Sequence, residues 1–487
     1  MDEGARVAEL EAENAALRAG NDALTDRVRV LEEQLALVMG KVAELEKLLA
    51  RNSSNSSKPP SSDPGGVKSG RPENANRKAR RALGRTQGKQ PGAPGQTLAQ
   101  VTSPDVVHIH QPGRCRSCDR SLGDAPVVGH VIRQVFDVPD PTVVVTEHRV
   151  QRRRCACGCE TAGTFPAEAT APACYGPSIK AHAIYLMCAQ HLPRERCAQA
   201  LADLFGVKVS TGTLDNWMRE AADALVVFLA VVGAQLSAAP VVHADETSVR
   251  SGKTALWVHV CCTALLTLLH VGRRDKTTVE AGPLGDYRGT IVHDRLAMYF
   301  GYGTGHVLCN AHILRSLNEL LANPQHRGWA QAFIGLIIDT KERVDTARAA
   351  GKPALSAYQQ RKIRRRWNEL CGQAAQAAPQ PPPGIYPYGT NKDARNLALA
   401  LAAHRDLFLA YTRDPTLPFD NNAAERDLRM IKLQAKISGE FRSQTGAARF
   451  AAIRSYISTN RKQAQNIHQH LKNLYTPTGA WLPLPTT

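Results

Sequence analysis

The first fifty residues carry a regular seven-residue repeat of apolar positions. One series consists of Leu10, Leu17, Leu24, Leu31, Val38 and Leu45. A second series, three residues ahead of the first, consists of Val7, Asn14, Asn21, Val28, Leu35 and Val42, with Leu49 closing it. Such a stripe on a lone helix would face water, so the repeat predicts a leucine-zipper coiled coil over residues 1–50; a helix that packs on its own domain is the alternative. Asn at two seam positions favours a parallel dimer, because buried Asn pairs best with Asn across such a dimer.

The pattern stops after the zipper, and Ser, Asn, Pro and Gly dominate the next stretch. Residues 58–100 hold nine Lys or Arg, two acidic residues and no aromatic residue. Residues 51–104 are therefore expected to form a basic, flexible linker. The excess of positive charge favours an arm that lies on nucleic-acid phosphates, although a plain soluble tether has the same composition.

Five cysteines are concentrated between residues 105 and 170. They are Cys115 and Cys118, in a Cys-x-x-Cys pair, and Cys155, Cys157 and Cys159, in the sequence CACGC. The segment 130–154 between the two groups predicts two β-strands around a turn at Pro139-Asp140-Pro141. Those strands would bring the groups together, and four thiolates make a closed structural Zn²⁺ site.

The choice of zinc ligands depends on the second cysteine group. The expected set is Cys115, Cys118, Cys155 and Cys157. Gly158 favours this set because it permits the tight turn that a zinc knuckle needs. Cys159 in place of Cys157 is one alternative, and reduced, unliganded cysteines are another. Arg152, Arg153 and Arg154 directly precede the cluster and are expected to face DNA phosphates.

Residues 171–238 show helical periodicity. Helices are predicted over 177–190, within 193–206 with Gly206 as the stop, and from Thr211 to Leu225 with Ser210 as the cap. Two helices joined by a short Gly-containing turn are typical of helix-turn-helix DNA-binding units, although ordinary helical hairpins share the pattern. The candidates for contact with base edges are Thr213, Asn216 and Arg219, whose spacing by three places them on one face of the last helix.

From residue 239 the pattern changes to apolar strands. The expected order is a buried strand over 239–250 with Asp245 near its end, two strands over 256–272 and a helix over 273–285. Within the segment 290–300 an apolar strand is expected to end on Asp294, and residues 306–321 predict a short strand that runs into a helix. This β-β-β-α-β-α order is that of an RNase H-like sheet, in which the first and fourth strands are neighbours. Asp245 and Asp294 are therefore expected to share a divalent ion, Mg²⁺ or Mn²⁺, which hard oxygen ligands select.

A third carboxylate is expected from a later helix. The segment 418–441 predicts a helix that carries Glu425, with Asp420 as its cap. Because 131 residues separate Asp294 from Glu425, residues 316–417 are expected to be a helical insertion in the core.

The composition of the whole chain narrows the class of protein. Lys and Arg number 61 against 44 acidic residues, and the net charge of +17 implies a polyanionic partner, either nucleic acid or an anionic membrane surface. The 43% hydrophobic content excludes wholesale disorder, and twelve cysteines are too few for a disulfide scaffold. The sequence shows neither a signal peptide nor an apolar span of about 20 residues, so no membrane partner is expected and a reducing cytoplasm is the expected location.

Several segments of the chain resemble the transposases of the IS66 family of bacterial insertion sequences. They are the zipper start, NSSNSSKPPSSD at 52–63, the two cysteine groups, HADETSVR at 243–250, HDRLAMYF at 293–300, CNAHILRSL at 309–317 and DNNAAERDLR at 420–429. The resemblance implies a DDE catalytic triad of Asp245, Asp294 and Glu425. It also implies that Cys309 and His312, in a Cys-x-x-His motif, support the site. The chain departs from the family pattern in the third cysteine of CACGC and in Arg295, where Gly is more usual.

The function that the resemblance implies is DNA transposition. The enzyme would bind the ends of the insertion sequence, cut a strand by hydrolysis with two Mg²⁺ (or Mn²⁺) ions per active site, and join the freed 3′-OH to target DNA. Asp245 would bridge both ions, while Asp294 and Glu425 would hold one each. The expected partners are double-stranded DNA at the element ends and the target, a second copy or a higher oligomer formed through the zipper, and element-encoded accessory proteins, at the bacterial nucleoid.

Two other functions fit the same residues. One is a zipper-dimerised zinc-finger DNA-binding regulator with an inactive catalytic domain, and the other is a structure-selective RNase H-like nuclease without strand transfer.

These patterns together predict a multidomain α/β chain. Its expected parts are a coiled coil (1–50), a basic linker (51–104), a small zinc-binding β module (105–170), helix-turn-helix-like DNA-binding helices (171–238), the first part of an RNase H-like core (239–315), a helical insertion (316–417), and the second part of the core with a C-terminal element (418–487).

Overall fold

The computed structural model describes residues 3–49, 98–138, 140–252, 254–380, 389–476 and 479. The chain divides into two compact units, one formed by residues 64–144 and the other by residues 1–63 and 145–487. The predicted basic linker lies outside the described residues as far as residue 97, and so does Pro139 at the centre of the predicted turn.

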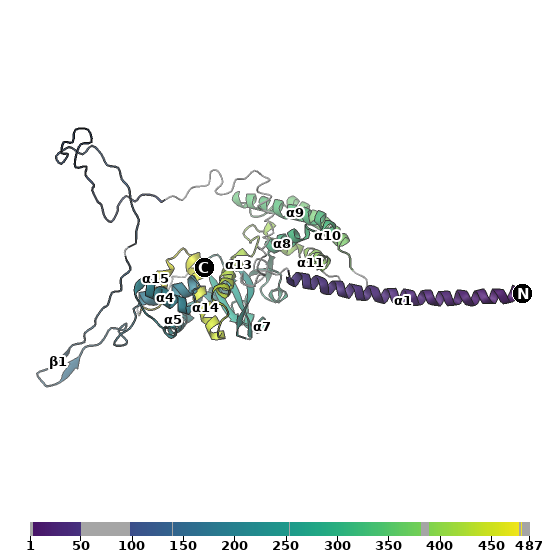
Figure 1. Ribbon diagram of the computed structural model, residues 1–487, viewed down its shortest axis with the longest axis horizontal. Coiled ribbons are helices and arrows are strands. Elements are labelled where there is room, and N and C mark those ends of the chain that lie inside the picture. Colours follow the sequence, from purple (N-terminus) through teal and green to yellow (C-terminus); the bar gives the residue numbers. More distant parts are fainter. Residues whose placement is uncertain are drawn as a thin grey trace. The chain divides into compact units, whose positions relative to one another are not determined.

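The predicted N-terminal helix is present as α1, Glu3–Leu49 (Figure 1). Within this single chain the seam residues Leu17, Leu24 and Leu31 are more than half exposed. A leucine seam that is exposed to water in this way is expected to be covered by another helix. Pairing of α1 into a coiled coil stays a prediction.

The two strands predicted around Pro139-Asp140-Pro141 are absent from the described residues 98–138 and 140–151. Apolar side chains there, among them Val131 and Val135, are more than 90% exposed. Alternation makes a strand only where a neighbouring backbone accepts its hydrogen bonds, and no described segment pairs with this one. The strands observed are β1 (Arg152–Arg154) and β2 (Glu160–Ala162), a short antiparallel pair on either side of the CACGC cluster.

A group of helices precedes the main sheet, as predicted. They are α3 (Pro177–Ile184), continued by the π-helical turn η2 (Tyr185–Ala189), α4 (Arg194–Phe205), α5 (Thr211–Ala224) and α6 (Val226–Ala238). Gly206 ends α4 in the left-handed region with φ of 68°, a conformation that glycine adopts without strain. Ser210 caps α5 by accepting a hydrogen bond from the Thr213 N–H.

In the described part of the chain, no single helix is both long and apolar enough to cross a membrane. The pair α5 and α6 reaches the required length and apolar content only when both helices are counted, and they are bent by 46° with respect to each other.

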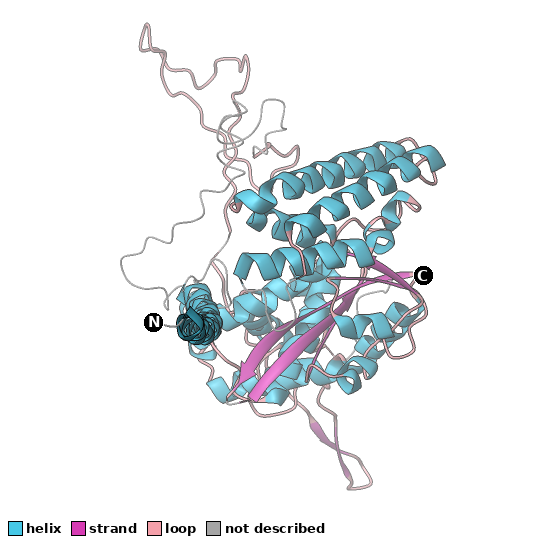
Figure 2. Ribbon diagram, turned by 90° about the vertical axis from the view of Figure 1, so that its right-hand side faces the viewer, coloured by secondary structure: helices cyan, strands magenta, loops and turns pink. Residues whose placement is uncertain are grey.

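The main sheet makes the protein a mixed α/β fold. Its strands are β3 (Val241–Ser251), β4 (Thr254–Cys262), β5 (Thr267–Gly272), β6 (Thr290–His293) and β7 (Gly305–Leu308), with α7 (Lys276–Glu280) and the 3₁₀ turn η3 (Ala297–Gly301) between strands. The spatial order is β5-β4-β3-β6-β7. Figure 2 shows long strands of this sheet in magenta, with helices beside them. β3, β4 and β5 are antiparallel neighbours, whereas β3 pairs with β6, and β6 with β7, in parallel. The predicted contact of the first strand with the fourth is therefore present.

A separate helical core follows the sheet, as predicted for the insertion. It contains α8 (Asn310–Leu320), α9 (Pro324–Ala349), α10 (Ala357–Ala377), α11 (Gly389–Ala403), α12 (Arg405–Phe408) and the turn η4 (Ala410–Thr412). Its centre is aromatic, with Phe333, Trp367 and Phe408 fully buried. The Trp367 Nε1–H donates to the Leu401 carbonyl at 2.9 Å, so this large ring leaves no unpaired polar group inside.

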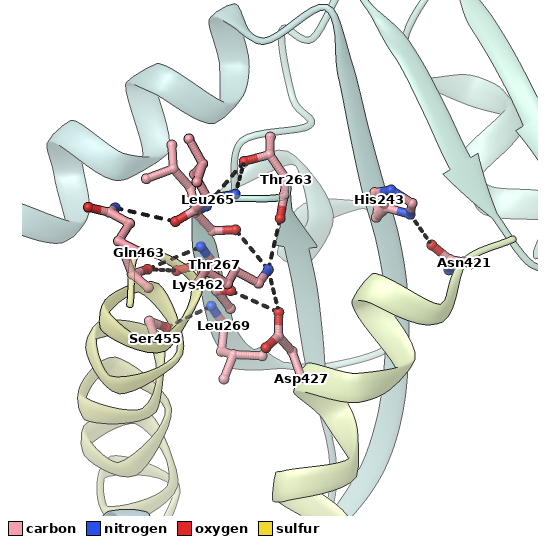
Figure 3. Close-up of polar contacts among 12 residues, drawn as sticks. His243, Thr263, Leu265, Thr267, Leu269, Asn421, Asp427, Ser455, Lys462 and Gln463 are labelled. Carbon is pink, nitrogen blue, oxygen red and sulfur yellow. Dashed lines mark hydrogen bonds and ion pairs between the residues drawn. The ribbon is translucent and has the colours of Figure 1, made fainter. Parts of the chain in front are cut away.

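The chain then returns to the sheet with α13 (Asn422–Ser438), α14 (Gln444–Lys462) and α15 (Ile467–Asn473). Side chains of α14 complete the backbone hydrogen bonding of the edge strand β5. The Leu269 N–H donates to Ser455 Oγ at 2.8 Å, and the Thr267 N–H donates to Thr459 Oγ1 at 3.2 Å (Figure 3). The sheet edge at β5 is thereby covered by polar helix side chains.

A buried ion pair fastens α13 to the same edge. Lys462 Nζ lies 2.8 Å from Asp427 Oδ2, and both side chains are at most 15% exposed. Lys462 also donates to the carbonyls of Thr263 and Leu266, while the Thr267 hydroxyl donates to Asp427 at 2.8 Å (Figure 3). Each charge therefore has hydrogen-bond partners besides its counter-ion, the condition under which a buried pair is tolerated.

Replacing Lys462 by Met should lower the free energy of unfolding by about 3–5 kcal/mol, because Asp427 would keep a buried charge without its cation. Urea unfolding followed by tryptophan fluorescence measures this loss. The double variant Asp427→Leu with Lys462→Met should lose less, since it leaves no unpaired charge. An equal or greater loss in the double variant would contradict an ion-pair role.

Candidate active site

Two of the predicted acids follow neighbouring strands in equivalent positions. In the parallel pairing of β3 with β6, Val241 lies opposite Thr290 and His243 opposite Val292. Asp245 and Asp294 each come two residues after the last of these paired residues, so the register brings them to the same point of the sheet. The prediction that Asp245 lies near the end of its strand is wrong. β3 continues to Ser251 because its pairing with β4 extends beyond its pairing with β6.

The chain turns sharply directly after Asp294. Arg295 adopts φ of 83°, in the left-handed region where a side chain is strained and glycine is not. Asp294 Oδ1 accepts the Leu296 N–H at 3.0 Å, which fixes the carboxylate against the turn. Burial lowers the pKa of the Arg295 guanidinium, although the charge of Asp294 opposes that shift. The Arg295 side chain therefore brings a half-buried cation beside an acid.

The third predicted acid, Glu425, lies in the first turn of α13. The prediction that Asp420 caps this helix is wrong, because the residue at the cap position of α13 is Asn421. Asp420 Oδ1 instead accepts the N–H of Asn422, the first residue of the helix, at 3.0 Å. Glu425 Oε1 lies 3.5 Å from His312 Nδ1, and Oε2 lies 3.8 Å from the Arg315 guanidinium. Both partners come from α8, so this helix faces Glu425.

The negative charges of these acids act on one another. The pKa of Asp245 is raised to about 7, first by burial and then by the charge of Asp294, with smaller contributions from Glu246 and Glu425. Glu425 Oε1 is buried and has no hydrogen-bond partner among the described residues. Carboxylate oxygens without enough hydrogen-bond donors are the kind of ligand that oxygen-preferring divalent cations bind.

A softer ligand set shares one of these acids. One atom each of Cys309, His312 and Glu425 lies within 4.8 Å of the other two, close enough to hold a metal ion together. Burial raises the pKa of the Cys309 thiol to about 11, and the same cause lowers the pKa of His312. The sequence motif Cys-x-x-His thus lies against Glu425 at the start of α8.

Asn421, which sequence reasoning did not single out, joins three of these elements. Its side chain is fully buried; Nδ2 donates to the Ala244 carbonyl at 2.9 Å, and Oδ1 lies 2.9 Å from His243 Nδ1 (Figure 3). Its backbone N–H donates to Cys309 Sγ at 3.1 Å. Asn421 therefore fixes the start of α13 to β3 and to the start of α8.

Glu246 is a second residue that sequence reasoning missed. Its side chain is 5% exposed, and one oxygen lies 2.8 Å from the Arg274 guanidinium. The other oxygen accepts the Tyr299 hydroxyl at 2.7 Å. Arg274 in turn lies over the Trp257 ring at 4.4 Å. Glu246 is thus a satisfied structural acid beside Asp245, and only the three-dimensional partners reveal it.

The two cysteine groups have similar local backbones, each within its own unit. The Asp119 N–H donates to the Cys115 carbonyl, and Asp119 has φ of 55°. Likewise the Gly158 N–H donates to the Cys155 carbonyl, and Gly158 has φ of 87°. In both groups a left-handed residue follows the second cysteine of the pair, Cys118 or Cys157, in a closed turn.

The thiols of these turns are activated by their neighbours. The pKa of Cys115 is lowered, first by the backbone N–H of Cys118, and the pKa of Cys157 is lowered, first by the backbone N–H of Cys159. Hydrogen bonds to the charged form favour a thiolate, the form that binds zinc.

The residues expected to contact DNA are at the surface. Arg152, Arg153 and Arg154 form the exposed strand β1, where Arg154 pairs with Glu160 at 2.6 Å. On α5, Asn216 and Arg219 are exposed. Thr213 is half-buried, and its hydroxyl lies 2.9 Å from Ser210 Oγ in the cap of α5. The Thr213 hydroxyl is therefore already engaged in a hydrogen bond at the start of α5.

Comparison with known families gives two matches. A family described as "Transposase IS66 family" matches residues 172–449, more than half of the chain. A family of unknown function, DUF6444, matches residues 2–99. Among curated proteins, none matches this sequence.

With divalent metal chelated, the stability of the folded chain should fall as pH rises from about 4 to about 7. The folded pKa of Asp245 lies near 7, above its ordinary value of 3.8, so the unfolded chain binds fewer protons in that window. Asp245→Asn should remove this fall, so its thermal midpoint should exceed that of the wild type increasingly as pH rises through the window, and most of all above it.

The same variant provides the control for metal. Added Mg²⁺ should raise the midpoint of the wild type and have little effect on Asp245→Asn, because a ligand that binds only the folded state stabilises it. Equal midpoints of the two proteins above the window would contradict the shifted pKa.

Proposed function

The chain belongs to the IS66 family of transposases, a family of DNA-processing enzymes, and we propose that it is a DDE enzyme that binds the ends of an insertion sequence, cuts a DNA strand and joins the 3′-OH to target DNA. The observation that carries this proposal is the convergence of Asp245, Asp294 and Glu425. They come from β3, the turn after β6, and α13, and the charges of the other two raise the pKa of Asp245. The sheet order and the parallel pairing of β3 with β6 support an RNase H-like core, interrupted by the helices of residues 316–417.

The acids are proposed to hold two Mg²⁺ or Mn²⁺ ions. Asp245, Asp294 and Glu425 would be the residues that hold these ions. When bound, the ions would supply the charge that activates a water or a 3′-hydroxyl and stabilises the leaving oxygen. The fit rests on the raised pKa of Asp245 and on the buried, unpartnered oxygen of Glu425.

The protein's own residues would position these ligands. Asn421 fixes the start of α13, and with it the backbone that carries Glu425, against β3. Cys309 supports the same point by accepting the Asn421 N–H, and His312 and Arg315 face the Glu425 carboxylate. Cys309 and His312 are accordingly proposed as positioning residues.

A structural zinc site is proposed for Cys115, Cys118, Cys155 and Cys157. The two closed turns with a left-handed residue after Cys118 and after Cys157 support this pairing over one with Cys159. The lowered pKa of Cys115 and of Cys157 supports thiolate ligands.

DNA binding and self-association complete the proposal. α5, which begins at the Ser210 cap, would face the DNA with Asn216 and Arg219. Arg152, Arg153 and Arg154 in the exposed strand β1 would contact phosphates. The exposed seam of α1 supports a parallel dimer through the zipper.

Single replacements of Asp245, Asp294 or Glu425 by Ala should abolish strand cleavage and strand joining. Binding of end-containing DNA should change little, because the proposed DNA-contacting surfaces remain. Cleavage is measured on a labelled duplex with Mg²⁺, joining by the appearance of longer products, and binding by fluorescence anisotropy.

Glu246→Ala tests whether the chemistry belongs to these three acids, although this variant also loses a buried partner of Arg274 and Tyr299. Glu246→Gln is therefore the matched control. It keeps an acceptor oxygen for Arg274, its amide N–H can donate to the Tyr299 hydroxyl, and it should retain cleavage. Wild-type cleavage by Glu425→Ala would refute the third ligand, and cleavage without joining by the wild type would indicate a nuclease.

About one Zn²⁺ per chain should copurify with the protein, because four thiolates make a closed site. Cys157→Ser should lose this zinc, whereas Cys159→Ser should keep it. Elemental analysis of the wild type and of both variants measures their zinc content. Zinc loss in Cys159→Ser alone would mean that Cys159 is the fourth ligand.

A further inference from the structure

A pocket lined by arginines lies between α5 and the start of α14. Its volume is about 240 Å³, room for roughly eight waters at about 30 Å³ each. The charged groups that line it are Arg194, Arg219, Arg442, Arg449 and Asp215. Four cations and one acid therefore converge on one concave surface.

Three of these cations lack a protein partner. Arg194 is paired with Asp215, which joins α4 to α5. Within the described part of the chain, no side chain or carbonyl forms a hydrogen bond or ion pair with the guanidinium groups of Arg219, Arg442 or Arg449. Glu195, next to Arg194 in the sequence, and Glu440, two residues before Arg442, line the adjoining pocket and not this one. Glu220, next to Arg219, pairs with Lys180. The positive charge of the pocket is left for an external anion.

The backbone around the pocket is suited to the same kind of ligand. Ser443 caps α14 by accepting the Gly446 N–H at 3.0 Å, so the positive end of a 19-residue helix opens at the pocket. Arg442 precedes this helix, Arg449 lies in its second turn, and Arg219 comes from α5. A guanidinium is a planar fork that matches two phosphate oxygens, so three of them select a phosphate group.

We infer that this pocket holds a phosphate of the DNA backbone, and that Arg219 contacts this phosphate instead of a base edge. The inference rests on the proposed DNA-binding function and deepens it. The helix expected to read sequence and the catalytic core would hold the same DNA strand, because α5 and α14 both contribute to one phosphate site. Of the two exposed candidates on α5, base reading would then fall to Asn216.

The test uses the full-length protein and two duplexes of equal length, one carrying the element end and one of mixed sequence. Binding is measured by fluorescence anisotropy over a series of KCl concentrations. The variants are Arg219→Gln and the double variant Arg442→Gln with Arg449→Gln. Arg461→Gln is the matched control for Arg219→Gln, because it also removes a single charge, from an exposed position at the other end of α14.

Each pocket variant should weaken binding to both duplexes by the same factor, roughly tenfold or more for lost charge-assisted contacts. The slope of log K against log salt should become shallower by about 0.9, the value for one phosphate contact. The control should keep the wild-type slope. Circular dichroism should be unchanged in every variant, since Arg219 and Arg442 are exposed and Arg449 is half-buried.

Two results would overturn the inference while leaving the proposed function intact. One is wild-type affinity and slope in the double variant, which would mean that no phosphate lies in the pocket. The other is a loss confined to the element-end duplex in Arg219→Gln, which would make Arg219 a base-reading residue. Failure of the wild type to bind either duplex would refute the proposed function itself, and with it this site.

Discussion

The buried side chain of Asn421 is the contact on which the arrangement of the candidate site depends. It donates to the backbone of β3 next to Asp245, and its own N–H is held by Cys309 at the start of α8. β3 and α13 are separated by more than 170 positions in the sequence. An amide that satisfies buried groups on both sides is expensive to displace, because each partner would be left unpaired away from water. The distance between Asp245 and the helix that carries Glu425 is therefore fixed by hydrogen bonds and not by apolar packing alone.

The electrostatics of the site follow from that fixed arrangement. Burial raises the pKa of Asp245, and the charges of Asp294 and Glu425 raise it further. Arg295 lies beside Asp294, and Arg315 lies beside Glu425. These two cations are too few to neutralise three carboxylates. A site with surplus negative charge in a chain of net charge +17 has opposite sign to its surroundings. Phosphates would be attracted to the protein as a whole, whereas cations would be attracted to this one point.

Sequence reasoning reached the order of the strands and the adjacency of Asp245 and Asp294, because apolar runs, turn residues and parallel pairing determine both locally. It also found the caps Ser210 and Gly206, whose effect extends over only a few residues. It failed for the strands around Pro139, because alternation does not supply the neighbouring backbone that a strand requires.

The remaining residues escaped prediction for a related reason. Asn421 and Glu246 act through partners that are distant in sequence or depend on a turn formed elsewhere, and their residue types carry no local signal. Arg295 was visible as a departure from the family pattern, but its left-handed backbone was not.

The way in which α14 covers β5 has a consequence for how the chain is made. The Thr267 N–H forms its hydrogen bond with the Thr459 hydroxyl, which lies 192 positions later in the sequence and is therefore synthesised later. At about 5–20 residues per second, a ribosome would take roughly 10–40 s to add that length. During that interval the half-made sheet exposes an unpaired, apolar strand at its edge, to which another nascent chain could add. The moment of greatest risk for this protein is thus set by the order of its segments, and it ends only when the last helices leave the ribosome.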